Sequence, residues 1–138
     1  MKTLILPLFI LFFMSSPSEN YPLNPCPKSP NCVCTCDPDP KKTMEPLSHS
    51  STVAEAKSAM KKMVASISGT QLLEEQDFYL HFVFTTSLGG FEDDVEFYFE
   101  EGGEIIHFRS ASRKGYGDLG ANKRRMKKIT KAWNKLNK

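Results

Sequence analysis

Three carboxylates near the middle of the chain, Asp93, Asp94 and Glu96, are candidates for acid–base chemistry. Two later arginines, Arg109 and Arg113, could stabilise negative charge that develops during a reaction. Catalytic carboxylates need an enclosing pocket that separates their pKa values, and the sequence indicates no such pocket. We therefore expect charged groups at the entrance of a strand. A small acid–base enzyme of the hydrolase type, using a carboxylate–arginine cluster, is the alternative.

A glycine-rich loop follows these residues. From Gly115 to Gly120 it matches the G-x-G-x-x-G pattern of dinucleotide-binding loops. That pattern belongs to a parallel sheet, whereas the strands before this loop are predicted to form antiparallel hairpins, so we expect no dinucleotide cofactor. The remaining alternative is a simple anion site made of Arg113, Lys114, Gly115, Gly117 and Gly120. We prefer a structural loop, because Asp118 would repel an anion and cap the following helix.

Four cysteines, Cys26, Cys32, Cys34 and Cys36, lie close together in a proline-rich segment that excludes helix and central strand. In an oxidising compartment disulfides are the default, and four cysteines allow three pairings. We favour Cys26–Cys32, which closes a small loop worth about 2 kcal/mol in the chain-entropy model. A metal site is the weaker alternative, because zinc ligand pairs usually stand two to four residues apart. We assign no metal and no cofactor.

The first 18 residues are expected to be a secretory signal peptide. Lys2 precedes an apolar run from Leu4 to Met14, and the small residues Ser16 and Ser18 follow it, so we expect cleavage near Ser18. A helix of that run would reach about 16 Å, roughly half of the hydrocarbon core, which disfavours a membrane-spanning segment. We therefore expect an exported protein, periplasmic or secreted. An uncleaved N-terminal membrane anchor is the alternative.

Two helices are predicted, one on each side of a group of strands. Thr52 and Glu55 form a capping box before an apolar stripe at helical spacing, which Gly69 ends. A second, narrow stripe made of Met126, Ile129, Trp133 and Leu136 predicts a helix from about Ala121 to Leu136. Each helix therefore has one apolar side that it must bury.

Strands are predicted between these helices. Residues 71–75 are an expected edge strand, and three segments of alternating apolar residues are separated by Gly89-Gly90 and Gly102-Gly103. If both diglycines form two-residue turns, the first hairpin pairs Phe84 with Val95, Phe82 with Phe97 and Leu80 with Phe99. The second pairs Val95 with Ser110, Phe97 with Phe108 and Phe99 with Ile106. All these apolar side chains then share one face, and Glu96 and Arg109 form an ion pair on the other.

The predicted fold class is α+β: a two-layer domain with an antiparallel sheet of about four strands and two helices packed on one face. We assign residues 19–50 to an irregular proline- and cysteine-rich segment and residues 51–138 to the α+β domain. The length of 138 residues, with 40% hydrophobic and 25% charged residues, suits one ordinary domain. It excludes a multidomain enzyme, a fibrous repeat and a polytopic membrane protein.

Charge is segregated along the chain although the net charge is only +2. Residues 71–104 contain ten acidic residues and no lysine or arginine, whereas residues 113–138 contain ten basic residues and one acidic residue. A basic helix can bind nucleic acid or anionic lipid. We prefer a solvated helix face and expect no nucleic-acid partner, because an exported protein seldom meets nucleic acid. Weak contact of the last helix with an anionic membrane surface is a second alternative.

Three segments resemble the signatures of the domain-of-unknown-function 1499 family (DUF1499): residues 26–33, 93–97 and 109–125. The chain departs from the family pattern at Cys34-Thr35, where serines are usual, and at Ala121, where valine is usual. The family has no settled activity, so the resemblance implies domain organisation and export. The polar residues that it marks are Asp93, Asp94, Glu96, Arg109, Ser110, Ser112, Arg113, Asp118 and Asn122.

We expect several of these polar residues to form one buried or half-buried network where the strand ends meet the last helix. In that network Asp94 or Asp118 would pair with Arg113. The function we expect is a non-catalytic exported domain that binds or scaffolds an envelope component.

Overall fold

The computed structural model describes residues 23–138, so the expected signal peptide and its cleavage position lie outside the described residues. No helix within residues 23–138 is both long enough and apolar enough to span a membrane. The elements, in chain order, are β1 (Cys32–Cys34), β2 (Leu47–Ser48), α1 (Val53–Ala65), β3 (Thr70–Gln76), β4 (Tyr79–Thr85), β5 (Glu92–Phe99), β6 (Ile105–Ser112) and α2 (Ala121–Leu136).

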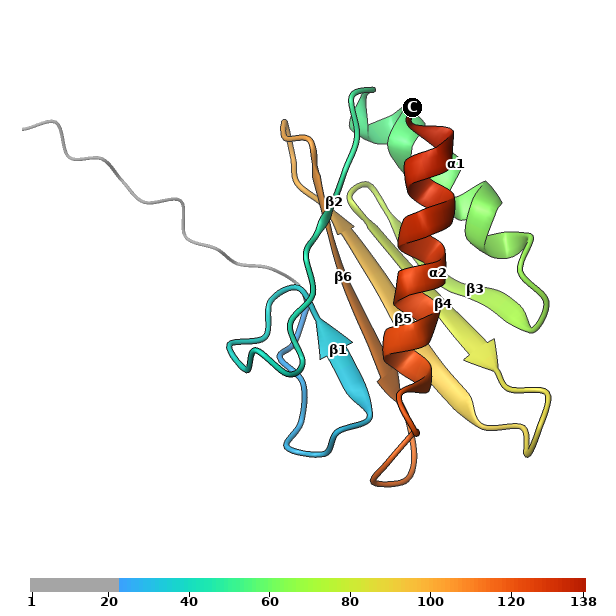
Figure 1. Ribbon diagram of the computed structural model, residues 1–138. Helices are drawn as coiled ribbons and strands as arrows, with labels where there is room; N and C mark the ends of the chain where they lie inside the picture. The colour runs from blue at the N-terminus through green and yellow to red at the C-terminus, as the bar shows by residue number, and fades with distance from the viewer. Residues whose placement is uncertain (1–22) are drawn as a thin grey trace, which may run out of the picture.

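The fold is α+β, with both helices on the same face of one antiparallel sheet (Figure 1). The sheet has six strands in the order β1-β6-β5-β4-β3, and β2 also pairs with β6. The prediction of about four strands is therefore too low. The two extra strands lie in the proline- and cysteine-rich segment expected to be irregular. They are only three and two residues long, too short to show an alternating pattern, and β6 determines their pairing.

The register of the second hairpin is as predicted. Val95 pairs with Ser110, Phe97 with Phe108, and Phe99 with Ile106. The connecting loop is longer than a two-residue turn, because the Glu100 amide bonds the Ile105 carbonyl at 3.0 Å and the Gly103 amide bonds the Glu100 carbonyl at 3.1 Å. The loop is still centred on Gly102-Gly103, and Gly102 has a φ of 68° that suits glycine. The predicted pairing of residues is therefore correct, although the predicted loop is too short.

The predicted register of the first hairpin is wrong by two residues. Phe82 pairs with Val95 and Leu80 pairs with Phe97, because the loop covers residues 86–91 instead of Gly89-Gly90 alone. Thr86 closes this wider loop: its amide donates to the Phe91 carbonyl at 2.9 Å, and its Oγ1 accepts from the Phe91 amide at 3.0 Å. A shift of two residues keeps every side chain on its predicted face, because the pleat has a period of two.

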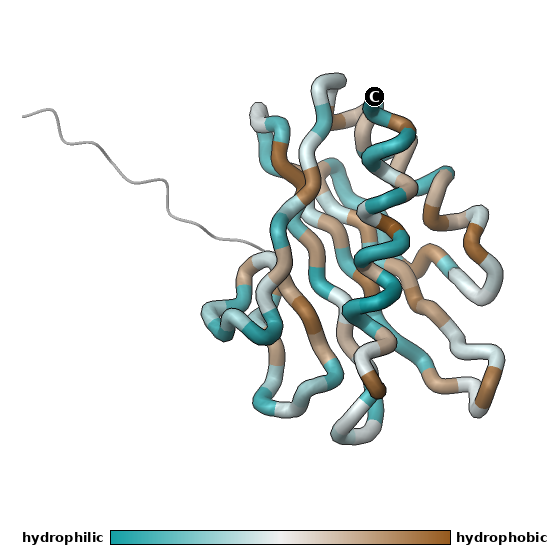
Figure 2. Tube along the Cα trace, viewed as in Figure 1, coloured by the Kyte–Doolittle hydropathy of each residue, from teal (hydrophilic) through white to brown (hydrophobic). Residues whose placement is uncertain are grey.

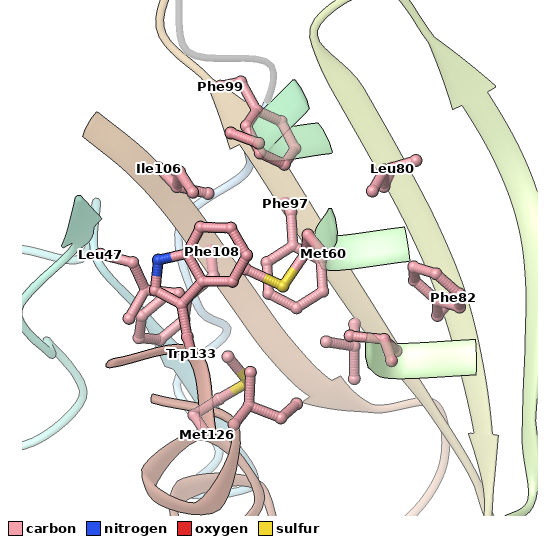
Figure 3. Packing of buried hydrophobic residues seen from close by; sticks show 14 of the residues in the cluster. Leu47, Met60, Leu80, Phe82, Phe97, Phe99, Ile106, Phe108, Met126 and Trp133 are labelled. Carbon is pink, nitrogen blue, oxygen red and sulfur yellow. The ribbon is translucent and has the colours of Figure 1, made fainter. Parts of the chain in front are cut away.

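The core lies between the inner face of the sheet and the two helices (Figure 3). Phe82, Phe97 and Phe108 are all fully buried and come from three adjacent strands. The rings of Phe82 and Phe97 meet edge to face, with centroids 6.4 Å apart. Above them the helices contribute fully buried side chains, including Met60 and Trp133. Figure 2 shows hydrophobic positions along the strands and hydrophobic positions among hydrophilic ones along the helices.

Both helices begin as predicted. In α1 the capping box is complete, since the Glu55 amide donates to Thr52 Oγ1 and the Thr52 amide donates to Glu55 Oε2. The α1 helix ends at Ala65, before the predicted end at Gly69, so Ile67 lies beyond the helix and is exposed. In α2 the last stripe residue, Leu136, is also exposed, because it lies in the final turn of the helix.

Two disulfides hold the segment around β1. Cys26–Cys32, the favoured pair, is present, and Cys34–Cys36 is the second. Between them, β1 pairs with the far half of β6, with Cys32 opposite Ala111 and Cys34 opposite Arg109.

The opposite edge of the sheet is β3. Its pairing with β4 is interrupted by a bulge between Leu72 and Glu74. Most of its side chains are exposed, including the acidic Glu74 and Glu75.

Candidate functional site

The nine signature residues lie on both faces of the sheet. Successive strand residues point to opposite faces, so Asp93 and Ser110 face the helices whereas Asp94 and Arg109 face outward. Ser112, Asp118 and Asn122 join the helix-facing group. Glu96 and Arg113 join the outer group. We call these the inner polar cluster and the outer charged cluster.

Asn122, in the first turn of α2, is the centre of the inner polar cluster. Its Oδ1 accepts hydrogen bonds from Ser110 Oγ at 2.6 Å and from Arg125 Nη1 at 2.8 Å. Its Nδ2 donates to Ser112 Oγ at 2.9 Å and to Asp118 Oδ2 at 2.8 Å. Asn122 is only 1% exposed, so these bonds satisfy an amide that burial would otherwise penalise.

Arg125 and Asp93 form a buried ion pair at the edge of this cluster. Arg125 Nη2 donates to Asp93 Oδ2, and the two side chains are 13% and 4% exposed. The guanidinium carbon also lies 4.9 Å from the centroid of the Phe84 ring, which is a cation–π arrangement. A buried charge is tolerated only when it is paired and hydrogen-bonded, and here both groups are. The pair joins α2 to the start of β5.

Asp118 caps α2, as expected. Gly120, with a φ of 75°, has no side chain to cap the helix. Asp118 replaces it: Oδ1 accepts from the Gly120 amide at 2.8 Å and Oδ2 accepts from the Asn122 amide at 2.9 Å. Partial burial would raise the pKa of Asp118, but these bonds and the one from the Asn122 side chain outweigh it and lower that pKa below 3.8. Asp118 is therefore an ionised structural cap.

The outer charged cluster is a set of ion pairs. Arg113 holds Asp94 with two nitrogens, Nε at 3.0 Å from Oδ2 and Nη2 at 2.9 Å from Oδ1, and it also bonds Glu92 at 2.9 Å. This is the predicted pairing of Arg113 with Asp94. Asp94 Oδ1 also lies 2.7 Å from His81 Nε2. Partial burial would raise the pKa of Asp94, but the hydrogen bonds from Arg113 and His81 lower it, and Asp94 raises the pKa of Arg113.

The predicted ion pair between Glu96 and Arg109 is also present, with Arg109 Nη1 at 3.1 Å from Glu96 Oε2. The Tyr79 hydroxyl donates to the other oxygen of Glu96 at 2.6 Å. Burial of Tyr79 and its bond to Glu96 raise the pKa of that hydroxyl well above 10.0. Each signature carboxylate of the outer face therefore has a basic partner and a second hydrogen-bonding neighbour.

The sequence prediction of one network holds for part of the set. Five of the nine residues, Asp93, Ser110, Ser112, Asp118 and Asn122, meet where the strand ends reach α2. Arg113 is absent from that network because it follows β6 and turns to the outer face. Arg125 was missed as a member: it stands in a run of basic residues, although its spacing of three from Asn122 and four from Ile129 indicates the buried side of the helix.

Three residues of the alternative anion site, Lys114, Gly115 and Gly117, line the same hollow. Arg113 is engaged with Asp94 and Glu92 on the outer face. The Gly115 carbonyl accepts from Asn31 Nδ2 at 2.7 Å. The amides at the helix start already bond Asp118. Within residues 23–138, no three or more His, Cys, Asp and Glu side chains are grouped so that they could hold a metal ion.

Two hollows flank the inner polar cluster. The first, the interhelical groove, has a volume of about 510 Å³ between the end of α1 and the first half of α2. Its apolar surface comes from Met63, Ile67, Phe84, Ile129 and Ala132, and its cations are Arg124, Arg125 and Lys128. The second, of about 370 Å³, lies between loops 86–91 and 113–120. Asp93 and Ser112 line it beside the apolar side chains of Phe91 and Leu119.

One comparison with known proteins finds a match. The family described as "Protein of unknown function (DUF1499)" matches residues 22–133, which is most of the 138-residue chain. No curated protein and no solved structure matches the chain.

Proposed function

The chain belongs to the DUF1499 family of proteins of unknown function, and we propose that it is a non-catalytic binding domain of the cell envelope. In this proposal the interhelical groove takes an amphipathic anion, a molecule with an apolar body and one negatively charged group. The two disulfides support an exported location, because disulfides persist mainly in oxidising compartments.

The composition of the interhelical groove carries the proposal. Its volume of about 510 Å³ is within the usual range of small-molecule sites. Met63, Ile67 and Ala132 offer an apolar surface, with the almost fully buried Phe84 and Ile129 beneath them, while the exposed Arg124 and Lys128 stand at its edge. Neither cation forms an ion pair with a carboxylate among the described residues. An apolar body would displace water from the groove, and its anionic group would meet these cations.

The electrostatics of the signature residues favour binding over acid–base catalysis. A catalytic acid needs a raised pKa, whereas the pKa values of both Asp94 and Asp118 are lowered. Neither Asp94 nor Arg113 lines the interhelical groove or the hollow between loops 86–91 and 113–120. In this proposal the signature residues support the fold that forms the groove.

Two dyes that differ by one charge test the proposal. Anilinonaphthalene sulfonate has an apolar body and a sulfonate, whereas phenylnaphthylamine has a similar body and no charge. We expect fluorescence titration of the oxidised protein to show tighter binding of the sulfonate. The R124Q/K128Q variant should weaken sulfonate binding several-fold and leave the neutral dye unchanged. The Ala132→Phe variant, which fills the groove, should weaken both.

The matched control is Lys135→Gln, an exposed lysine near the far end of α2. This variant should bind both dyes like the parent protein. Equal loss of sulfonate binding in Lys135→Gln and R124Q/K128Q would refute the groove as the site, as would unchanged binding in Ala132→Phe.

A further inference from the structure

Exposed apolar side chains are concentrated at one end of the molecule. Among residues 23–138, seven large hydrophobic side chains are exposed, and four of them lie in loops 86–91 and 113–120. Leu88 is 87% exposed, Phe91 61%, Tyr116 76% and Leu119 94%. The two loops are neighbours, since both line the hollow of about 370 Å³ and the Arg113 amide bonds the Glu92 carbonyl at 3.1 Å. We call this region the apolar loop end; it is at the bottom of the view in Figure 1.

Hydrogen bonds hold these loops in shape. In loop 86–91, Thr86 Oγ1 accepts from the Phe91 amide and donates to the Leu88 carbonyl, each at 3.0 Å. In loop 113–120, Asp118 bonds the Gly120 amide, and Asn31 bonds the Gly115 carbonyl at 2.7 Å. The apolar side chains are therefore presented by ordered backbone. Figure 2 shows hydrophobic positions on both loops.

Leu119 is unfavourable for the folded protein in two ways. Its φ of 52° makes it the single non-glycine residue with positive φ among residues 23–138, and a leucine backbone in that region is strained. Its side chain is also almost fully in water. A glycine or asparagine would fit the backbone and the solvent better. Neither feature helps folding, so the leucine at this position points to a contact outside the domain.

The two ends of the domain differ in the charges of their loops. Beside the apolar loop end stand Lys114, Lys123 and Arg124, all exposed and none in an ion pair among the described residues. At the opposite end, the hairpin loops carry the exposed acidic residues Asp77, Glu101 and Glu104. The last turn of α2 and the residues after it add the exposed Lys135 and Lys138 at that end, which therefore carries charges of both signs. A negatively charged surface would attract the apolar loop end more strongly, so the charges and the apolar side chains favour the same orientation.

We propose that the apolar loop end docks on an anionic phospholipid bilayer, with Leu88, Phe91, Tyr116 and Leu119 entering the interfacial region. Lys114, Lys123 and Arg124 would then contact lipid phosphates. Apolar side chains with basic residues beside them are the combination that peripheral membrane binding uses. Attachment through two loop tips leaves α2 and the interhelical groove at the side of the docked domain. This surface shares Arg124 with the interhelical groove and is otherwise separate from it.

Vesicle sedimentation tests the docking. The oxidised protein should bind vesicles made of equal parts of phosphatidylcholine and phosphatidylglycerol, and should bind phosphatidylcholine alone at least tenfold more weakly. The L88S/L119S variant should lose at least tenfold in partitioning. Its near-ultraviolet circular dichroism should match that of the parent, because both side chains are exposed. The matched control is Leu136→Ser, which removes an exposed leucine from the other end of α2 and should leave binding unchanged.

Two results would overturn the proposal: absence of binding to the anionic vesicles, or binding that L88S/L119S leaves intact. The second result, with loss of binding at high salt, would indicate a purely electrostatic contact by the basic face of α2. The groove is tested separately: L88S/L119S should keep the affinity for anilinonaphthalene sulfonate, and Ala132→Phe should keep the affinity for vesicles. Failure of either proposal is thus distinguishable from failure of the other.

A tryptophan placed in the loop reports insertion directly. Trp133 is buried in the core and supplies a constant background. In Leu88→Trp, the emission of the new indole should shift to shorter wavelength when anionic vesicles are added, and brominated lipids should quench it. Leu136→Trp should show neither change. Emission of Leu88→Trp that the vesicles leave unaltered would refute insertion.

Discussion

The side-chain amide of Asn122 donates a hydrogen bond to the carbonyl oxygen of Asn31, 91 positions earlier in the chain, at 3.1 Å. The same carbonyl accepts from the Ser112 amide at 3.0 Å. One backbone oxygen therefore connects the disulfide-bonded segment, the end of β6 and the first turn of α2. Because Asn122 also bonds Ser110 and Asp118, this side chain joins four parts of the domain.

Asn122→Ala should destabilise the protein strongly. The change removes the Asn122 side chain, to which Ser110 and Asp118 are hydrogen-bonded in the folded protein. An unsatisfied buried polar group costs roughly 1–3 kcal/mol. We expect a loss of about 2–4 kcal/mol in the free energy of unfolding, measured by urea denaturation. Asn134→Ala, at an exposed position of the same helix, is the control and should change stability by less than about 0.5 kcal/mol. A loss in Asn122→Ala as small as that of the control would contradict the central role of Asn122.

Arg125→Met should be far more harmful than Arg113→Met. Removing Arg125 leaves the carboxylate of Asp93 buried and unpaired, which typically costs about 3–5 kcal/mol. Arg113 serves as the matched case, because it also pairs with an aspartate but stands at an exposed position, where ion pairs contribute under about 1 kcal/mol. The double variant D93A/R125M should recover part of the loss in the same denaturation assay. Similar losses of stability in the two arginine variants would show that the buried pair contributes no more than the exposed pair.

Stability should fall when the solution is acidified. The pKa values of Asp94 and Asp118 are lower in the folded protein than their ordinary 3.8, so the unfolded chain binds protons more readily. Their stabilisation is complete above that ordinary value and is lost as the pH falls through the lower folded values. The free energy of unfolding should therefore decline from about pH 5 downward. Asp118→Asn should make that decline shallower, and the same substitution at exposed Asp77 is the control. A decline of parental steepness in Asp118→Asn would refute the stabilising role assigned to the ionised cap.

The two disulfides should contribute unequally. In the chain-entropy model the C26S/C32S variant loses about 2 kcal/mol, and C34S/C36S loses less because its loop is shorter. Thermal unfolding of the two variants gives the comparison. Peptide mapping of the unreduced protein by mass spectrometry should find the two pairs of the structure. A Cys32–Cys34 peptide would contradict that pairing.

Strand faces could be predicted from the sequence better than strand partners. Alternation alone places Phe82, Phe97 and Phe108 on one face, because it depends only on the local pleat. The partner of Phe82 depends on the loop, and the sequence pattern of Gly89-Gly90 gives no sign that Thr86 closes a wider turn. Strands β1 and β2 are too short for a pattern, and they exist because β6 offers them an edge.

The contacts of the candidate site could likewise be predicted only in part. The pairing of Arg113 could be predicted in part, since the sequence left Asp94 and Asp118 as alternatives and the structure has Asp94. The partner of Asp93 could not, because the helical spacing places Arg125 on the buried side of α2 but does not show which strand residue it meets. The interhelical groove was also beyond prediction, because it depends on how far apart two helices lie on the sheet.

The outer edge of β3 bears on how the protein behaves when it is concentrated. An edge strand with free amide and carbonyl groups can recruit a second molecule and start a fibril. The bulge between Leu72 and Glu74 breaks the regular spacing of those groups, and the exposed Glu74 would repel an identical strand. At the far edge, β1 is too short to template a long ladder. Amyloid-like growth is therefore disfavoured at both edges of the sheet.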